Sequence, residues 1–217
     1  MKVKFVLLFF LWILSCPVAF PQLNYYEDSF NGGVITGGFS PDAYGGGAGI
    51  ITLVIPAGST IHKAYLMAGR HGNAAALTVT MNSLPYTFDA SNQVTSFNSP
   101  IYGGPSGVHV IDVTSDIDPL VPYYTLIIPF QSGPSDRYND FYLYVAYDNS
   151  SLSPVNTAIY LNTSDFDSVI NFTINLINPI QTSSDVGLSL FTGYICDNGQ
   201  DAEIIFFNSD TLGTIGG

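Results

Sequence analysis

The sequence predicts an all-β protein, an antiparallel β-sandwich of jelly-roll-like type with about 10 to 12 strands. Short runs of β-branched and aromatic residues, many alternating with polar residues, recur along the chain. Turn-forming residues separate these runs, as in 103–107 (GGPSG) and 132–136 (SGPSD). No helical segments alternate with the strands, and this favours antiparallel over parallel pairing.

Residues 1–22 have the pattern of a secretory signal peptide. Lys2 and Lys4 flank the start of an apolar run that continues unbroken over 5–14, and small residues follow it. The run is shorter than the roughly 20 apolar residues that a membrane span needs. We therefore expect a secreted or outer cell-surface protein with no transmembrane span in the mature chain. The alternative to cleavage is lipidation of Cys16, whose context ILSC loosely matches a lipoprotein box.

Residues 23–49 are expected to form a glycine-rich N-terminal segment ahead of a single β-sandwich domain over 50–217. A phosphate-binding loop would need a following helix with a lysine. The sequence offers neither, so a glycine-rich edge strand or a flexible approach is expected instead. Truncation at the C-terminus is an open alternative, since the chain stops at Gly217 just after an expected hairpin. Cys196 is interpreted as a small buried hydrophobic residue at a strand end. The alternative, if the chain is truncated, is a half-cystine whose partner lies beyond Gly217.

Within the main domain, ten segments have the alternation or the β-branched composition of strands. They are 50–56, 61–68, 77–81, 108–114, 124–129, 141–147, 158–162, 169–176, 186–195 and 203–207. A tight turn over 56–59 is expected after the first of them, and one short helical turn over 116–120. Two hairpins are expected to turn at Asn82-Ser83 and Asn208-Ser209, because Asn tolerates the positive φ of tight turns.

The charge balance is strongly acidic. Seventeen acidic residues face five basic ones, which gives a net charge of −12. Loss of Lys2 and Lys4 with the signal peptide leaves three basic residues, so the mature chain carries −14. Nucleic acid and anionic membrane surfaces are not expected as partners, because both require clustered Lys and Arg. Cations remain open as ligands, as does the simpler interpretation that the charge keeps a surface protein soluble.

No catalytic constellation is recognisable around the three histidines. The sequence has neither a Gly-x-Ser-x-Gly motif nor a His-Glu-x-x-His motif. His62 and His109 lie in expected strands and are interpreted as structural. Arg70 and His71, in the loop 69–73, form the polar cluster that we expect to contact a ligand. We expect a protein that is not an enzyme and has no catalytic residues.

Asp112, Asp116 and Asp118 are the candidate metal ligands. They lie at a strand end and turn, and Ca²⁺ prefers carboxylate oxygens. Ca²⁺ is the one cofactor that the sequence suggests. The spacing differs from an EF-hand loop, which needs a central glycine and a terminal Glu. Asp116 as the cap of a helical turn is the alternative. Residues 197–201 (DNGQD) are a weaker candidate, with a hairpin turn as the simpler interpretation.

Several motifs occur in an order that is similar to a known domain. The strand 63–69 (KAYLMAG) leads into 79–83 (VTMNS), DVT follows at 112–114, then comes 141–148 (FYLYVAYD), and 187–213 closes the series. This order resembles the N-terminal β-sandwich domain of large bacterial (Bacteroidetes-like) secreted or cell-surface adhesin-like proteins. The chain departs from that pattern in lacking its tryptophans and in having Asn-Ser where the family has Asn-Gly turns. The resemblance implies a surface or adhesion module and no known reaction.

The sequence therefore predicts a non-enzymatic, secreted or cell-surface β-sandwich module with an adhesion or structural role. Its expected partner is an extracellular surface, a glycan or a protein ligand. The first alternative is a Ca²⁺-dependent carbohydrate-binding module that stacks exposed tyrosines on sugars. The second is a secreted hydrolase that uses a pair of aspartates across a cleft. The oligomeric state is left open.

Overall fold

The computed structural model describes residues 22–41, 46–99, 104–131, 136–163 and 187–189, and the backbone of 203–207 and 210–215. These residues form twelve β-strands and two single-turn 3-10 helices, so the predicted all-β antiparallel sandwich is confirmed. The strands are β1 (Gln22–Phe39), β2 (Gly47–Thr52), β3 (Thr60–His71), β4 (Leu77–Met81), β5 (Leu84–Phe88), β6 (Phe97–Ser99), β7 (Gly104–Asp112), β8 (Tyr123–Ile128), β9 (Arg137–Asp148), β10 (Pro154–Asn162), β11 (Glu203–Phe207) and β12 (Asp210–Ile215). The helices are η1 (Ala90–Asn92) and η2 (Thr114–Asp116).

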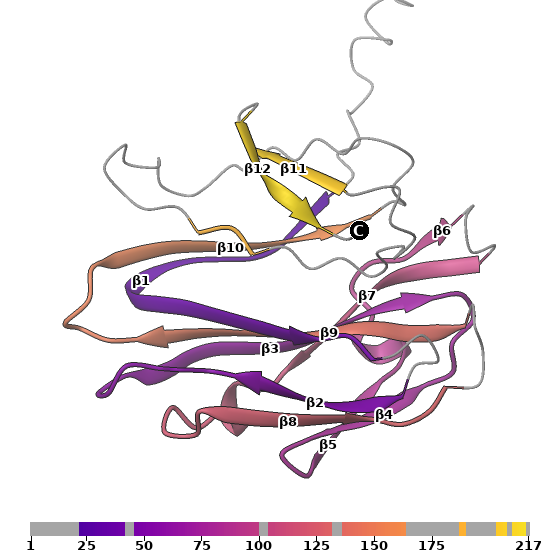
Figure 1. The fold of residues 1–217 in the computed structure, drawn as a ribbon, viewed down its shortest axis with the longest axis horizontal. Coiled ribbons are helices and arrows are strands. Elements are labelled where there is room, and N and C mark those ends of the chain that lie inside the picture. Colours follow the sequence, from indigo (N-terminus) through magenta and orange to yellow (C-terminus); the bar gives the residue numbers. More distant parts are fainter. Residues whose placement is uncertain are drawn as a thin grey trace, which may run out of the picture.

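The strands form three sheets. One has six strands in the order β10-β1-β9-β3-β7-β6, one has four in the order β2-β8-β4-β5, and β11 and β12 form a hairpin. Every strand pair is antiparallel. In Figure 1 the four-stranded sheet lies on one side of β9 and β3, while β10 and the first part of β1 lie on the other side.

Strand β1 changes partner in its middle. Residues 22–31 pair with β10, and residues 32–39 pair with β9. Figure 1 shows β1 folding back on itself at this point, so that its first half and β10 form an arm over the body of the sheet. Glycine allows the change of partner, because a Cβ on Gly32 would lie 1.9 Å from the carbonyl oxygen of Tyr147. The segment 23–49, expected ahead of the domain, thus supplies strands to both large sheets.

The main core lies between the body of the six-stranded sheet and the four-stranded sheet. Strand β8 contributes alternate residues to this core: Tyr124, Leu126 and Ile128 are buried, while the residues between them are exposed. These side chains pack in one cluster with Leu66 of β3 and Phe141 of β9, among others. Apolar burial of this extent is the main favourable term in folding.

A second, aromatic core lies under the arm. Its buried members include Phe30 on the arm, Tyr65 of β3 and Tyr144 of β9. A bulge in the β1–β10 pairing at Asn24/Tyr26 lets two consecutive tyrosines contact the same ring, with the Tyr25 and Tyr26 centroids 5.3 and 5.5 Å from Tyr65. Such edge-to-face pairs add to the area buried.

Most of the expected strands are present with shifted ends. The turn over 56–59 is confirmed by a 3.2 Å bond from the Ser59 amide to the Pro56 carbonyl. The first hairpin is confirmed, with Asn82 and Ser83 both at positive φ. The expected helical turn over 116–120 is wrong in position, since η2 spans Thr114–Asp116.

Several expectations concern parts of the chain that the structure does not describe. The strand expected over 169–176 lies outside the described residues, as do the signal peptide before Gln22, Cys196 and the candidate loop 197–201. Of the strand expected over 186–195, only 187–189 are described, and they are not in a strand. No helix within the described ranges is long and apolar enough to cross a membrane.

Candidate functional site

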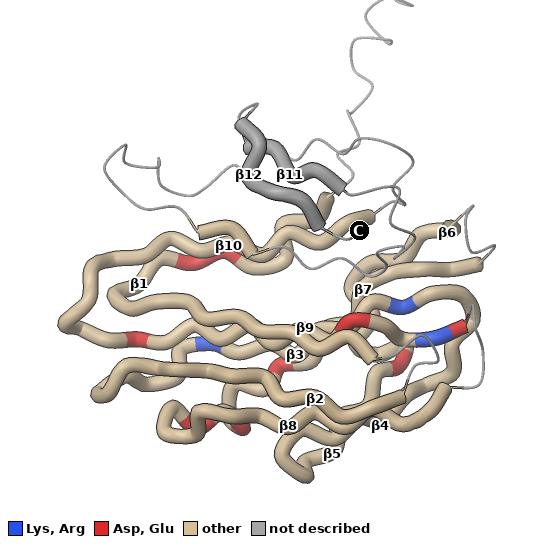
Figure 2. Tube along the Cα trace, in the orientation of Figure 1, with Lys and Arg blue, Asp and Glu red and all other residues tan. Residues whose placement is uncertain are grey.

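The surface of the four-stranded sheet that points away from the core is uncharged. We call it the outer face, formed by alternate residues of four strands: Ala48, Ile50, Thr52, Thr78, Thr80, Pro85, Thr87, Tyr123, Thr125 and Ile127. None of these four strands contains Asp, Glu, Lys, Arg or His at any position. In Figure 2 the acidic and basic residues accordingly lie on the other sheet and on connections between strands.

Exposed large apolar side chains gather at this sheet. In the described part of the chain seven of the nine lie on its strands or on the connections next to them: Ile50, Val54, Leu84, Leu120, Tyr123, Ile127 and Phe130. Leu120 is 83% exposed and Ile127 is 51% exposed. Three of the seven, Ile50, Tyr123 and Ile127, lie on the outer face itself. Single exposed apolar residues are ordinary, whereas a gathering of them at one sheet is a candidate interaction surface.

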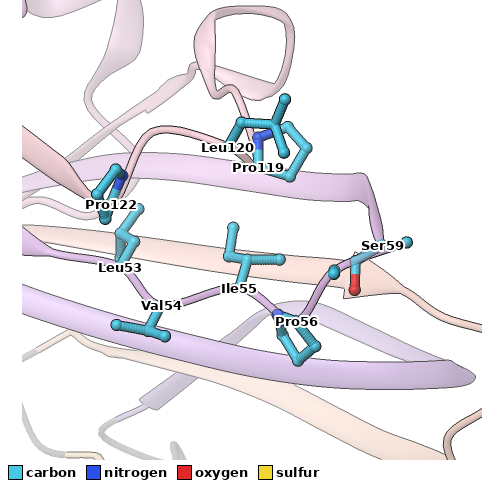
Figure 3. A pocket seen from close by; sticks show the side chains of 10 residues that line it. Leu53, Val54, Ile55, Pro56, Ser59, Pro119, Leu120 and Pro122 are labelled. Carbon is cyan, nitrogen blue, oxygen red and sulfur yellow. The ribbon is translucent and has the colours of Figure 1, made fainter.

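An apolar cleft opens at one end of this sheet. It lies between residues 53–59, which follow β2, and the connection that leads into β8, and it has a volume of about 220 Å³. Figure 3 shows Leu53 and Ile55 projecting toward Pro119, Leu120 and Pro122, whereas Val54 projects the other way. No acidic or basic side chain lines the cleft. Its chemistry therefore suits an apolar group and offers no aspartate pair for hydrolysis.

The predicted ligand residues Arg70 and His71 lie at the end of β3, within the strand and not in a loop. The Arg70 guanidinium donates to Gln93 Oε1 at 3.3 Å, and its Nε is buried with no hydrogen-bond partner among the described residues. A buried donor in that state is costly. The two residues point to opposite faces of the strand, as neighbours in a strand do, so the structure does not join them into one site.

His109 lies close to Arg70 and is fully buried. Its Nδ1 is 3.1 Å from Asn92 Oδ1, and its ring contacts Tyr138 edge-to-face. Burial, with a smaller effect from Arg70, lowers the pKa of His109 to about 4. The ring is therefore neutral at pH 7, in keeping with the structural role that the sequence suggested.

The three predicted metal ligands each bond to different donor groups of the protein. Asp112 binds Lys63 Nζ at 2.5 Å and accepts from the Thr114 amide at 3.0 Å. Asp116 accepts from the Tyr86 hydroxyl at 2.9 Å, and Asp118 accepts from the Leu120 amide at 2.9 Å. In the described residues no three His, Cys, Asp or Glu side chains converge as a metal site would require. A calcium site at 112–118 stays a prediction for which this geometry gives no support.

A charged cluster that the sequence analysis missed holds the arm to the body. His62 Nε2 lies 2.8 Å from Asp28 on the arm, and His62 Nδ1 lies 2.9 Å from Asp148 at the end of β9. Phe30 stacks on the imidazole ring at 4.4 Å. Burial lowers the pKa of His62, but the hydrogen bonds to Asp28 and Asp148 outweigh it and the net shift is upward. Sequence separation hid this cluster, because 34 residues separate His62 from Asp28 and 86 from Asp148.

The clustered tyrosines that could stack on sugars lie at positions 123, 124, 138, 142, 144 and 147, and three of the six are buried. Tyr124, Tyr138 and Tyr144 are core residues, and Tyr142 packs in part against the second core. Tyr147 is also partly buried, and Tyr123, 59% exposed on the outer face, is the member of this cluster that offers its ring most fully to a ligand. Comparisons with protein-family models, with curated proteins and with solved structures each found no match to this chain.

Proposed function

We propose that this protein is a non-enzymatic β-sandwich module of the extracellular or outer cell surface, with an adhesion or structural role, and that the outer face is its contact surface. The observation that carries the proposal is the gathering of exposed apolar side chains on a sheet without charged residues, in a chain of net charge −12. Two sequence features support it: the signal-peptide pattern of residues 1–22 and the resemblance to adhesin-like surface domains.

The chemistry of the outer face suits an uncharged partner. Its side chains are aliphatic groups, one tyrosine and five threonines. Apolar groups favour contacts that exclude water, and hydroxyls both donate and accept hydrogen bonds. The acidic remainder of the surface would repel an anionic partner. Binding of an uncharged partner to this uncharged face should be insensitive to salt, because there are no charge pairs for salt to screen.

Adsorption to films of defined chemistry tests the proposal. The purified protein should be retained on a film that presents mixed methyl and hydroxyl groups and should not be retained on a carboxylate film. Ile127→Glu places a charge in the middle of the outer face and should lower retention about tenfold, because a buried unpaired charge is costly. Asn98→Glu adds the same charge at an exposed position of β6, in the other sheet, and is the matched control. Equal retention of the two variants would remove the outer face as the contact surface.

A second candidate function is binding of a neutral glycan. Tyr123 favours it, because this exposed ring lies opposite Thr52 in the β2–β8 pairing and two residues from Thr125 on the same face. A ring flanked by hydroxyls can stack on a sugar and hydrogen-bond to it. A glycan array probed with and without Ca²⁺ tests this function. Binding that Tyr123→Ala abolishes supports it, and silence under both conditions rules against it.

A further inference from the structure

As far as the structure describes the chain, strand β2 is an end strand of the four-stranded sheet. Within the described residues β2 pairs with β8 alone. The Leu53 amide donates to the Pro122 carbonyl at 2.9 Å, and this bond extends the β2–β8 ladder by one residue. In an antiparallel ladder the residues alternate between pointing their backbone groups at the partner strand and away from it. Ala48, Ile50, Thr52 and Val54 therefore direct their N–H and C=O groups to the free edge.

The side chains of this edge lack the features that usually prevent pairing. Natural sheets protect an edge with lysine, proline or a bulge. Residues 47–55 read GAGIITLVI, with no charge and no proline, and the β2–β8 register has no bulge. The residues that direct backbone groups to the edge are also the exposed ones, as the alternation of buried Ile51 and Leu53 with exposed neighbours shows.

The opposite edge of the same sheet is protected. The two-residue turn at Asn82-Ser83 makes Met81 and Leu84 a hydrogen-bonded pair, so the following residue, Pro85, faces the free side of β5. Proline has no N–H to offer a new strand there. Proline therefore hinders pairing at one edge of the sheet, whereas the β2 edge has neither a proline nor a partner strand among the described residues.

Two copies of β2 can meet at this edge without bringing like charges together. Two copies that each carry −12 repel one another wherever carboxylates meet. Along β2 and the outer face beside it there are no charged side chains to oppose each other. Two identical edges can also satisfy each other about a two-fold axis, which is the commonest symmetry of protein dimers.

We propose that the protein self-associates through β2, which pairs antiparallel with β2 of a second copy and joins two four-stranded sheets into one of eight strands. A register centred on Ile51 sets Ile50 opposite Thr52 of the second copy and Ala48 opposite Val54. The residues whose backbone groups face the edge then form the hydrogen-bonded pairs. This inference deepens the proposed function, on which it rests, by naming a partner that a structural surface module meets at high local concentration.

Sedimentation of the purified protein over a range of concentrations tests self-association. A dimer should form as concentration rises, and it should tighten between 0.1 and 1 M NaCl, because salt shortens the screening length from about 10 Å to about 3 Å. Thr52→Pro removes one edge donor from each copy and should weaken the dimer about tenfold or more. A monomer at all concentrations, or a dimer that salt weakens, would overturn the proposal.

Two further variants separate edge pairing from contact through the flat face. Thr52→Glu adds a carboxylate at the edge, and Thr87→Glu adds one on the same face at the far strand β5. We expect the first to weaken the dimer and the second to leave it unchanged. Equal effects of the two, together with an unaffected Thr52→Pro dimer, would show contact through the face and overturn edge pairing. Thermal unfolding of each variant verifies that it folds.

The same variants distinguish failure of this inference from failure of the proposed function. A protein that is monomeric but retained on the methyl and hydroxyl film overturns self-association alone. A protein that dimerises through β2 but is not retained on that film overturns the proposed contact surface and leaves edge pairing standing.

Discussion

His62 and His109 lie in neighbouring strands of the six-stranded sheet but have opposite surroundings. His62 lies between two carboxylates, which favour its charged form. His109 is buried beside Arg70 and Tyr138, which favours its neutral form. The two residues should therefore change the stability of the protein with pH in opposite directions.

For His109, acid should destabilise the protein. Its folded pKa of about 4 lies below the unfolded value of 6.5, so the unfolded state binds the proton more readily between these limits. The free energy of unfolding should fall as pH drops from 6.5 to 4, by on the order of 3 kcal/mol. Urea unfolding at pH 7 and pH 4.5 measures this. His109→Gln should lose stability less steeply in that range, and identical pH profiles would contradict the prediction.

For His62, the contribution to stability should decrease as the pH rises. Its folded pKa is raised above 6.5, so its contribution is fully present below pH 6.5 and is lost as pH rises through the folded pKa. A neutral imidazole has one N–H and can donate to Asp28 or to Asp148, but not to both. The difference in unfolding free energy between the native protein and His62→Gln should be larger at pH 5.5 than at pH 8.5. A difference that does not change with pH would count against the charged bridge.

At the scale of single elements, the two turn residues of the β4–β5 hairpin are fixed by different interactions, one by local backbone conformation and the other also by tertiary contacts. Asn82 and Ser83 both have positive φ, as a two-residue hairpin turn requires. Asn82 also binds β8, accepting from the Thr125 amide at 2.8 Å and donating to the Tyr123 carbonyl at 3.4 Å. At Ser83 the positive φ strains the backbone, whereas at Asn82 the side chain also forms hydrogen bonds that hold the turn to β8.

Glycine should therefore have opposite effects at the two turn positions. Ser83→Gly should stabilise the protein by about 0.5–1 kcal/mol, because glycine adopts positive φ without strain. Asn82→Gly should destabilise it by about 1–2 kcal/mol, because two hydrogen bonds to β8 are lost. Chemical denaturation of both variants provides the comparison. Equal shifts would mean that backbone conformation alone decides the turn.

Individual elements were predicted to different degrees. Strands with strict alternation, such as β4 and β8, were located to within a residue or two, because one buried face fixes their pattern. The length of β1 was not predicted, since its glycines favour a loop and only pairing with two different strands makes it extended. Arg70 and His71 were expected in the loop 69–73, but pairing with β9 extends β3 through His71.

At the scale of the whole molecule, the arm of β10 and the first half of β1 covers the second core. It depends on the change of partner at Gly32, where the backbone of Tyr147 leaves no room for a Cβ. Neighbouring Gly33 is also crowded, since a Cβ there would lie 2.4 Å from the Tyr147 hydroxyl. Even a methyl group added at Gly32 or Gly33 should therefore disturb the attachment of the arm.

Gly32→Ala should loosen the arm and lower the unfolding free energy by about 1–3 kcal/mol, because the backbone must shift to accept the methyl group. Amide exchange should quicken in β10 and residues 22–31 more than in the four-stranded sheet. Gly187→Ala is the control, since nothing lies within 4 Å of its Cβ position. Uniform quickening of exchange across both sheets would show that the arm is no separate unit.

The sequence by itself determined the all-β class, the strongest strands, the first hairpin turn and the acidic charge. Each of these depends on composition or on neighbours a few residues apart, where the two-residue period and turn chemistry act. Only the tertiary structure decided the bridge of His62, the folding back of β1, the uncharged outer face and the open edge of β2. Those features depend on which strands pair and which faces are covered, and such long-range contacts leave no local pattern in the chain.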